Sequence, residues 1–583
     1  MPSLALFPTH SEQRVRWVQW VLSTPPTYSE PGPPGPPPPS TLNLDSNGRP
    51  ITMRSCLSGP DSALWMTAGG AELTKLVRDT ATMRPVMTCP RKPTYYNPVP
   101  REKWKGYIER RVRGVGGGDR CYVDYPVATH TCPMSVFKIL LHATVSENSH
   151  FGSLDLTDFF LGSLMPAPEY LIIMAAQFTP ALLDTLGITP FLQTDSKGRS
   201  YFFTEVSKTM YGFRQAGFHA NEQVIAHLLS HGYYQTQPCL FTHTTDPIVF
   251  CLVVDDYGVK YTHVDQFHRL VACLSLLYHV KASPVATSFL GFTISHDRQA
   301  RTIALSMPSY IPNMLARFRP EGVPPARSPS IYTPPSYGSS APQLSPTDTS
   351  APASPAQIEE LPQVIGSLLY YARALDCTML PAVTTLSSLQ SAPTLNVIAK
   401  LNRLLGYCSA FPDHQLIFRP SRMLLQTHSD ASFNSLPRSG SKSGGHHTLG
   451  NHDPAFHNAP IDVDSSRIPV VTSSAADAEL AAAYGNARSA HFHRATLQNI
   501  GYPQPPSPIF CDNECAIGIS SSSVKQKKSK SMDMRFNWLR DRVSQHHFYL
   551  PYIPSLKNIA DFFTKPLPVH RHAEFSPLLV HKP

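Results

Sequence analysis

Apolar and polar residues alternate along the chain with two different periods, one typical of helices and one typical of strands. In residues 135–146, SVFKILLHATVS, the apolar side chains Val136, Ile139, Leu140 and Ala143 recur at helical spacing. The same spacing predicts further helices at residues 216–233, which Gly232 closes, and at residues 363–375, 394–408 and 475–501.

Strand-like segments lie between these helices. Residues 151–162, FGSLDLTDFFLG, predict a strand that ends in polar residues. Residues 248–262, IVFCLVVDDYGVKYT, predict two strands that meet at a tight turn. Because both periods occur throughout, the pattern indicates an α/β or α+β chain in at least two pieces.

Two proline-rich segments interrupt the pattern. Residues 23–40 contain PGPPGPPPPS, which predicts an extended and poorly packed chain. Residues 320–357 are so rich in Pro, Ser and Thr that we expect them to bury too little surface to become ordered. We therefore expect these segments to separate the folded parts.

Composition narrows the class of protein only slightly. The chain has 583 residues, 42% of them hydrophobic, which is enough for about two to four domains with cores of their own. Its net charge of +9 permits an anionic partner such as nucleic acid. The 11 cysteines form no CxxC pair, so we expect neither a zinc site nor a disulfide framework. Without a secretion signal or an apolar run of about 18 residues, we expect an intracellular protein of cytoplasm or nucleus, with no membrane span.

Two adjacent carboxylates, Asp255 and Asp256, interrupt one of the most apolar stretches of the chain. A hairpin turn is the place where both can leave an apolar strand environment. Crowded carboxylates raise one another's pKa unless a cation compensates, and Mg²⁺ prefers such ligands. We expect a third acid on a neighbouring strand, where Asp155 follows an apolar approach and Asp158 comes three residues later. On these residues alone, a solvated turn and a helix N-cap at Asp155 stay open.

Three motifs make the interpretation more specific. LDLTDFFLG, KTMYGFRQAG and LVVDDYGVKY, in this order, resemble the consecutive palm motifs of reverse transcriptases of the copia-type retrotransposon class. The resemblance implies that Asp155, Asp255 and Asp256 are catalytic and bind Mg²⁺, with Mn²⁺ as the alternative metal. Lys281 is a candidate for the lysine that protonates departing pyrophosphate. One departure is Val253, where the family usually has tyrosine, and there we expect altered primer contact before loss of chemistry.

The same resemblance implies five substrate contacts. Phe160 matches the bulky residue that excludes a ribose 2′-OH and so favours deoxynucleotides, and Gln215 matches a contact to the incoming nucleotide. Upstream, Arg110, Arg111 and Arg113 stand beside a glycine run that resembles the fingers region. Arginines suit triphosphate recognition because their donors are planar and bidentate. A basic surface hairpin with a glycine turn is the alternative for this segment.

A second set of acids follows the long proline-rich segment. Asp430, Glu479, Asp512 and Asp561 each stand next to a segment that predicts buried structure. Any one of them alone is more typical of a surface or capping residue. In their order, within SDAS, AEL, CDN and ADFFTKPLP, they resemble the RNase H domain of the same elements. The resemblance implies that the four acids bind two Mg²⁺ ions and activate water to cut RNA in an RNA–DNA hybrid.

A lysine cluster and three histidines contain residue types that also occur in binding sites. A basic cluster between the last two acids predicts either a track for the hybrid's phosphates or a solvated face: Lys525, Lys527, Lys528 and Lys530. Three histidines of GGHHTLGNH lack a cysteine partner and helical spacing, which favours a loop over a metal site: His446, His447 and His452.

The predicted architecture is a right-hand polymerase of mixed α/β class, with fingers, palm and thumb- or connection-like helices, followed by an RNase H-like α/β domain. The expected borders are a disordered proline-rich segment at 1–44, fingers and palm at 45–319, a linker at 320–357, the connection-like region at 358–423, the RNase H-like domain at 424–570 and a tail at 571–583.

The predicted function is RNA-directed DNA synthesis followed by cleavage of the RNA template. Its partners would be template RNA, a DNA primer, deoxynucleoside triphosphates and the RNA–DNA hybrid, and the sequence specifies no oligomeric state. Capsid, protease and integrase segments are not recognisable, so the alternative is a catalytically inactive fragment or a domesticated nucleic-acid-binding protein. A third possibility is an RNase H-only enzyme. All seven acids are present, which argues against long neutral decay.

Overall fold

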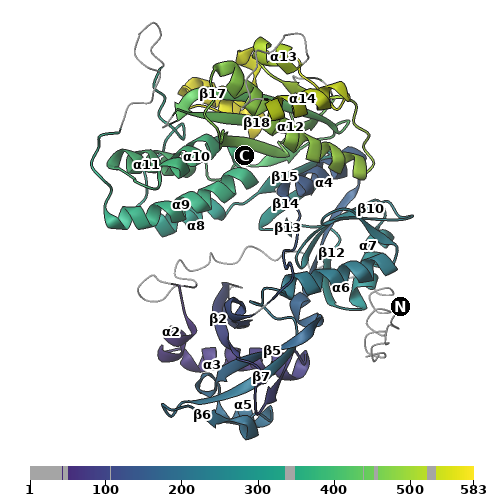
Figure 1. Ribbon diagram of the computed structural model, residues 1–583, viewed down its shortest axis with the longest axis vertical. Helices are drawn as coiled ribbons and strands as arrows, with labels where there is room; N and C mark the ends of the chain where they lie inside the picture. The colour runs from purple at the N-terminus through teal and green to yellow at the C-terminus, as the bar shows by residue number, and fades with distance from the viewer. Residues whose placement is uncertain are drawn as a thin grey trace.

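The computed structural model describes residues 43, 50–104, 107–121, 123–334, 348–436, 439–451, 453, 457–520 and 533–583. The four lysines of the basic cluster, His452 and nearly all of the segment 1–44 lie outside these residues, so the predictions made for them stay predictions. Figure 1 shows the described chain as an elongated body, with the earliest elements at its foot and the latest at its head.

The first sheet lies at the foot of the molecule and has the strand order β1-β7-β5-β2-β3, with β6 paired to β7 (Figure 1). Its glycine run packs directly on a turn further along the chain. The Gly116 N–H donates to the Tyr211 carbonyl at 2.8 Å, and a Cβ on Gly212 (φ +92°) would lie 2.2 Å from the Gly116 carbonyl oxygen. Glycine is therefore needed at this contact. The elements here are α2 (Met53–Ser58), α3 (Ser62–Thr74), α5 (Pro180–Thr185), β1 (Met83–Val86), β2 (Thr94–Trp104), β3 (Ile108–Gly116), β5 (Leu164–Met174), β6 (Gln193–Thr194) and β7 (Ser200–Lys208).

The second sheet is antiparallel, with the order β12-β4-β11-β10-β9-β8. Because side chains alternate across a strand, Leu154 and Tyr257 pack on one face with α6 and α7, whereas Phe151 packs on the other face with α4. The elements are α4 (Met134–Glu147), α6 (Ala216–Ser230), α7 (Val264–Ser275), β4 (His150–Thr157), β8 (Tyr233–Gln237), β9 (Leu240–His243), β10 (Ile248–Val253), β11 (Asp256–Tyr261) and β12 (His279–Ser283).

A small third sheet joins two distant parts of the chain. Its order is β13-β14-β15-β16, and β16 comes from the end of the region expected to be helical. Helix α9 begins with a capping box in which Ser354 and Gln357 bond each other's backbone N–H groups. The elements are β13 (Ser288–Phe289), β14 (Phe292–Asp297), β15 (Thr302–Ser306), β16 (Leu416–Phe418), α8 (Tyr310–Phe318), α9 (Pro355–Ala374), α10 (Leu380–Leu389) and α11 (Leu395–Ala410).

The fourth sheet, at the head of the molecule, mixes antiparallel and parallel pairs (Figure 1). Its order is β19-β18-β17-β20-β21, with β17 to β19 antiparallel and β20 parallel to both β17 and β21. The elements are β17 (Leu424–Leu436), β18 (Gly440–Gly450), β19 (Asp462–Arg467), β20 (Ser507–Phe510), β21 (Phe548–Tyr549), α12 (Ala475–Asn499), α13 (Glu514–Ser520), α14 (Asp533–Ser544), the short 3-10 helix η8 (Ile559–Phe563) and α15 (Val569–Leu579).

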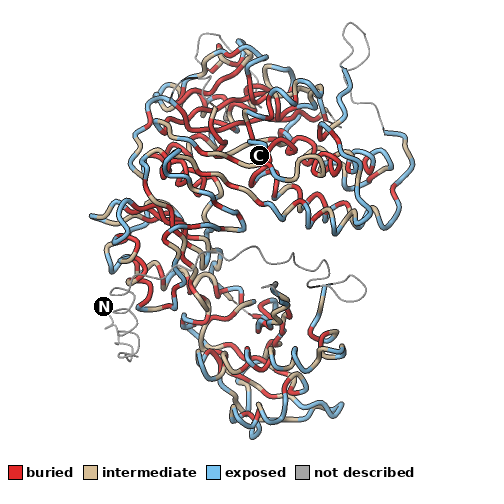
Figure 2. Tube along the Cα trace, turned by 180° about the vertical axis from the view of Figure 1, so that it is seen from behind, coloured by how far each residue is buried: buried red, intermediate tan, exposed pale blue. Residues whose placement is uncertain are grey.

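The predicted helices and strands are confirmed, and so is the mixed α/β class. Helix α4 differs from the expected one-sided helix, because residues 135–145 are all buried, including Lys138 and His142. The Lys138 ammonium donates to the Arg373 carbonyl at 3.3 Å, and His142 Nε2 lies 3.1 Å from the Ala459 carbonyl oxygen. Figure 2 shows buried chain throughout the upper half of the molecule, where α4 lies. Helix α4 thus packs in two cores, one that includes residues of the second sheet and one that includes residues of the fourth sheet.

The prediction of an unpacked linker at 320–357 was wrong at both of its ends. The Ala326 N–H donates to the Gly406 carbonyl at 2.9 Å, and a Cβ on Gly406 would lie 2.4 Å from the Pro324 carbonyl oxygen. At the other end Pro352 forms a bridge with Thr394. Extended proline-rich chain can therefore be held by the backbone of a neighbouring helix without a core of its own.

Two other predictions were also wrong. The tail expected at 571–583 forms most of α15, whose Phe575 and Leu579 are buried in the core around α9 to α11. The loop expected at His446 and His447 is part of β18, and both side chains are fully buried. In each case a neighbouring element that is distant in sequence supplies the cover.

Two glycines of β18 allow neighbours to approach it closely. A Cβ on Gly444 would lie 2.5 Å from the Ala560 carbonyl oxygen in η8, and a Cβ on Gly445 would lie 1.9 Å from Asn486 Oδ1 in α12. The Asn486 amide donates to the Gly444 carbonyl at 2.9 Å. These contacts bring η8 and α12 onto the sheet.

We expect Gly444→Ala to lower the free energy of unfolding by about 1–3 kcal/mol, because the new methyl group must displace the backbone of η8. Urea denaturation measures the change. The control is Gly366→Ala in α9, where a Cβ meets nothing within 4 Å, so stability should rise by about 0.5–1 kcal/mol. Equal effects of the two variants would contradict the close approach of η8.

Candidate active sites

The adjacent carboxylates Asp255 and Asp256 lie at the hairpin between β10 and β11. Val253 pairs with Asp256, and residues Val254 and Asp255 form the turn. Val254 has φ +60°, an unfavourable conformation for a β-branched residue. The turn thus holds Asp255 outside the strands, while Asp256 begins β11.

The third acid of this cluster lies directly opposite the hairpin. Asp155 of β4 is the register partner of Asp256 on β11, and the Leu156 N–H donates to the Asp255 carbonyl at 3.0 Å. Leu154 and Leu156 face the core with α6 and α7, so Asp155 faces the opposite side of the sheet. The structure therefore brings Asp155, Asp255 and Asp256 together.

Burial and repulsion act on these acids. Burial, followed by the charges of Asp255 and Asp155, raises the pKa of Asp256 to about 6. Burial is also the main cause that raises the pKa of Asp255, whereas the charges of Arg113 and Lys281 lower it. The Lys281 ammonium lies 3.0 Å from Asp155 Oδ2. Asp158, by contrast, forms an ion pair with Lys75.

Phe160 and Arg113, near the first cluster, both contact the ring of Tyr211. The ring of Phe160 meets the ring of Tyr211 edge-on with centroids 5.1 Å apart, and the Arg113 guanidinium lies 4.0 Å from the centroid of the same ring. Both contacts are favourable for an aromatic ring with a negative face. One stack therefore carries the predicted sugar-contacting residue and an arginine whose charge reaches Asp255.

The other predicted substrate residues are engaged elsewhere. Arg110 donates to Asp61 Oδ2 at 2.6 Å and stacks on a tryptophan of α3, and Arg111 pairs with Glu109 at 2.7 Å. Gln215 is 4% exposed, and its amide donates to Glu169 at 3.3 Å. Alternation along β3 places Arg110 on one face of the strand and Arg111 and Arg113 on the other, where Arg111 pairs with Glu109 and Arg113 lies over Tyr211.

The second set of acids comes from four elements of the fourth sheet and its covering helices. Asp430 lies on β17, Glu479 on α12, Asp512 directly after β20 and Asp561 in η8. Because β17 and β20 are adjacent parallel strands, Asp430 and Asp512 lie near the same edge. Carboxylate oxygens of Glu479 and Asp512 and the Cys511 sulfur lie within 4.8 Å of one another.

The charges of these acids act on one another in a dry environment. Burial is the largest cause that raises the pKa of Asp430, followed by the charge of Asp561, with a smaller rise from Asp512. Burial likewise raises the pKa of Glu479, with Asp430 and Asp512 adding to it. The structure therefore brings all four predicted acids into one cluster.

Three residues that were not predicted from the sequence support this cluster. The Thr564 hydroxyl donates to Asp430 Oδ2 at 2.6 Å, and the Lys565 ammonium lies 2.5 Å from Asp561 Oδ1. The Asn558 amide donates to the Ser429 carbonyl at 3.0 Å, which ties η8 to β17. Their signal was the motif NIADFFTKPLP, which contains all three next to the acid.

Both clusters fit divalent cations with a preference for oxygen ligands. The negative charges of crowded carboxylates repel one another. A bound cation offsets this repulsion. In the second cluster Glu479 Oε2 is buried and has no hydrogen-bond partner among the described residues. Asp155, Asp255 and Asp256 would hold metal in the first cluster, and Asp430, Glu479, Asp512 and Asp561 in the second.

The chain is similar in sequence to the polyproteins of transposons. No family model matches the chain. It is 24% identical over 380 residues to the retrovirus-related Pol polyprotein from transposon TNT 1-94 of Nicotiana tabacum, covering 64% of this chain and 28% of that protein. It is 23% identical over 385 residues to the transposon Ty1-GR3 Gag-Pol polyprotein of Saccharomyces cerevisiae, covering 62% and 21%. The chain is a distant relative of the copia/Ty1 Pol polyproteins.

The chain spans less than a third of the length of either relative. Among solved structures it is similar to the foamy viral protease-reverse transcriptase dRH in complex with double-stranded DNA, at 10% identity and a TM-score of 0.45, covering 85% of this chain and 70% of that one. Across its described residues, the chain contains no helix both long and apolar enough to cross a bilayer.

We expect Asp256→Asn to stabilise the metal-free chain by about 1 kcal/mol at pH 7.5, after allowance for solvent screening. The folded-state pKa of about 6 lies above the ordinary value of 3.8, so the charged carboxylate destabilises the fold above pH 6. This penalty fades as pH falls, and so should the gain by pH 4. Urea denaturation with a chelator measures both.

The matched control is Asp184→Asn, which removes an exposed carboxylate of α5. Its stability should stay within a few tenths of a kcal/mol at either pH. A pH-independent gain from Asp256→Asn would show that burial and the neighbouring charges do not raise the pKa of Asp256.

Proposed function

We propose that this region is an RNA-directed DNA polymerase with a second site that cleaves RNA in an RNA–DNA hybrid. The observation that carries the proposal is the pairing of Asp155 with Asp256 across β4 and β11, with Asp255 in the adjoining turn. Template RNA, a DNA primer and deoxynucleoside triphosphates would be the substrates, and Mg²⁺ or Mn²⁺ the cofactor.

The proposed chemistry is attack of the primer 3′-OH on the α-phosphate of a deoxynucleotide. Metal ions bound by the three carboxylates would stabilise charge on the attacking and leaving oxygens. Arg113, held over Tyr211, would donate to the triphosphate. Phe160, fixed against the same tyrosine, would exclude a 2′-OH by its bulk. Lys281 is already at the cluster and could donate a proton to departing pyrophosphate.

The second site would cleave the RNA strand of the product hybrid. Asp430, Glu479, Asp512 and Asp561 would hold its metal ions, which activate water for hydrolysis. Thr564 and Lys565 would act as positioning residues, since each bonds one of the acids. Two changes to the proposed domain borders follow: the connection-like region would begin at Ser354, the N-cap of α9, and α15 would pack on that region instead of forming a tail.

We expect paired variants to separate the two activities. Asp255→Asn should abolish Mg²⁺-dependent extension on poly(rA)–oligo(dT), by about a thousandfold or more, and leave cleavage of a preformed hybrid intact, because several kcal/mol of metal-borne stabilisation are lost at one site only. Asp430→Asn should do the reverse. Asp184→Asn serves as the control in both assays.

Each other outcome identifies another function. Hybrid binding without extension or cleavage favours the inactive nucleic-acid-binding alternative. Cleavage without extension by the unmodified chain favours an RNase H-only enzyme. Loss of both activities in each single variant would contradict two separate sites.

Arg113 and Arg111 of β3 should differ in their effect on deoxynucleotide binding. We expect Arg113→Gln to raise the KM for deoxynucleotides about tenfold, because one charge-assisted hydrogen bond is worth about 1.5 kcal/mol. Arg111→Gln should change KM less than about twofold, since Arg111 is exposed and paired with Glu109. Steady-state primer extension at varied deoxynucleotide concentration measures both. Equal effects would favour a general basic hairpin over a specific contact.

A further inference from the structure

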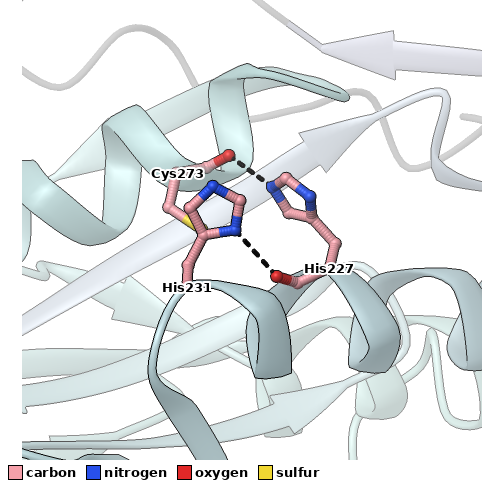
Figure 3. Close-up of side chains that lie close together, drawn as sticks. All are labelled: His227, His231 and Cys273. Atoms are coloured by element: carbon pink, nitrogen blue, oxygen red, sulfur yellow. Dashed lines mark hydrogen bonds between the residues drawn. The ribbon is translucent and has the colours of Figure 1, made fainter. Parts of the chain in front are cut away.

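A cluster of two imidazoles and a thiol lies away from both carboxylate sites. His227 and His231 stand one turn apart near the end of α6, and Cys273 stands in the last turn of α7 (Figure 3). One ligand atom from each of the three side chains lies within 4.8 Å of the others. Helices α6 and α7 cover the face of the second sheet opposite Asp155, so this cluster is distinct from the first active site.

We propose that His227, His231 and Cys273 form a binding site for Zn²⁺. Zinc is bound by imidazole nitrogen and thiolate, at about 2.0–2.1 Å and 2.3 Å respectively. In a tetrahedral site these bond lengths place the ligand atoms about 3.4–3.6 Å apart. The observed upper bound of 4.8 Å exceeds that separation by an amount that small side-chain rotations can close.

The hydrogen bonds of the two imidazoles hold them near each other. His231 Nδ1 lies 2.9 Å from the His227 carbonyl oxygen, and His227 Nε2 lies 2.8 Å from the Cys273 carbonyl oxygen (Figure 3). Because a carbonyl can only accept, His231 Nδ1 carries the proton, and its Nε2 is free to bind metal. A backbone carbonyl at the other ring nitrogen is the usual support of a histidine ligand. His227 would bind through Nδ1, or through Nε2 after giving up its bond to Cys273.

The surroundings favour a cation at this place. Helix α6 ends at Ser230 and α7 ends at Ser275, so the negative ends of two helix dipoles converge on the cluster. The nearest arginine of α7, Arg269, is already paired with Asp246 at 2.7 Å. Cys273 is 7% exposed and His231 is exposed, which leaves an open side for a water molecule as fourth ligand.

The ligand set distinguishes this site from the carboxylate clusters. Thiolate and imidazole prefer Zn²⁺ or Co²⁺, whereas carboxylates accept Mg²⁺. No zinc site was expected from the sequence because its cysteines form no CxxC pair, and these three ligands, which come from two helices, form no short motif. Bound zinc would join the ends of α6 and α7 and stabilise the second sheet, whether or not the chain polymerises DNA.

The test uses the full chain, stripped of metal under reducing conditions and titrated with Co²⁺ in excess Mg²⁺, which occupies the carboxylate clusters. We expect one equivalent of Co²⁺ to give the near-ultraviolet charge-transfer band of a cobalt–thiolate bond. Cys273→Ser should abolish this band. Cys511→Ser is the matched control and should keep it, because Cys511 stands beside Glu479 and Asp512 in the other cluster.

The histidines are tested through affinity and stability. His231→Ala should raise the Kd for Zn²⁺ by at least about tenfold. Removal of a residue that only supports a metal ligand already weakens binding by about that factor. His231→Ala should also remove the rise in Tm that Zn²⁺ gives the unmodified chain. His268→Ala in α7 should alter neither quantity. Because His231 is exposed, this variant should fold even if Cys273→Ser does not.

Three results would overturn the proposal. These are the absence of a cobalt–thiolate band, a band that survives Cys273→Ser, and a zinc affinity unchanged by His231→Ala. A band lost only in Cys511→Ser would place the thiophilic metal at the second carboxylate cluster instead. None of these readouts uses catalytic activity, so failure here leaves the proposed polymerase function untouched.

Discussion

Repulsion between carboxylates in partly dry surroundings is the constraint on which the rest of the structure depends. Neither cluster could stay compact as a free set of side chains, because burial and the neighbouring charges together raise the pKa of Asp256, Asp430 and Glu479. The fold opposes this repulsion with backbone geometry. At the first cluster, strand register and a turn with positive φ at Val254 hold the acids. At the second, a helix, two strands and η8 converge, with Thr564 and Lys565 bonding two of the acids.

The two clusters are connected by helix α4. Its Phe137 and Leu140 pack in the core that includes the connection-like helices, whereas Ile139 and Ala143 pack in the core of the fourth sheet. Burial lowers the pKa of Lys138 to about 8 and that of His142 to about 4, so both polar side chains depend on backbone carbonyls for compensation. A helix with no solvated face is a rigid connection, and it fixes the palm-like sheet relative to the last domain.

The sequence predicted much of this arrangement because its signals are local. Hydrophobic period identified α4, α6 and the β10–β11 hairpin, and short motifs identified the acids that the structure brings together. What remained hidden depends on partners distant in sequence. The apolar spacing of α4 does not show that Lys138 is buried, because its burial depends on α9, whose Arg373 carbonyl accepts from its ammonium. Arg110 and Arg113 are similar in sequence, but alternation on β3 directs one toward α3 and the other toward Tyr211.

The full burial of α4 also has a consequence for how such chains evolve. Domains joined by a flexible linker can be exchanged between related polyproteins with little adjustment. Here a replacement for the last domain would have to match the surface of α4, which packs on the second sheet, and would have to supply the carbonyl that meets His142. Recombination between distantly related genes should therefore succeed when α4 and the fourth sheet are inherited as a pair. Residues at the interface between them should change by coordinated substitutions.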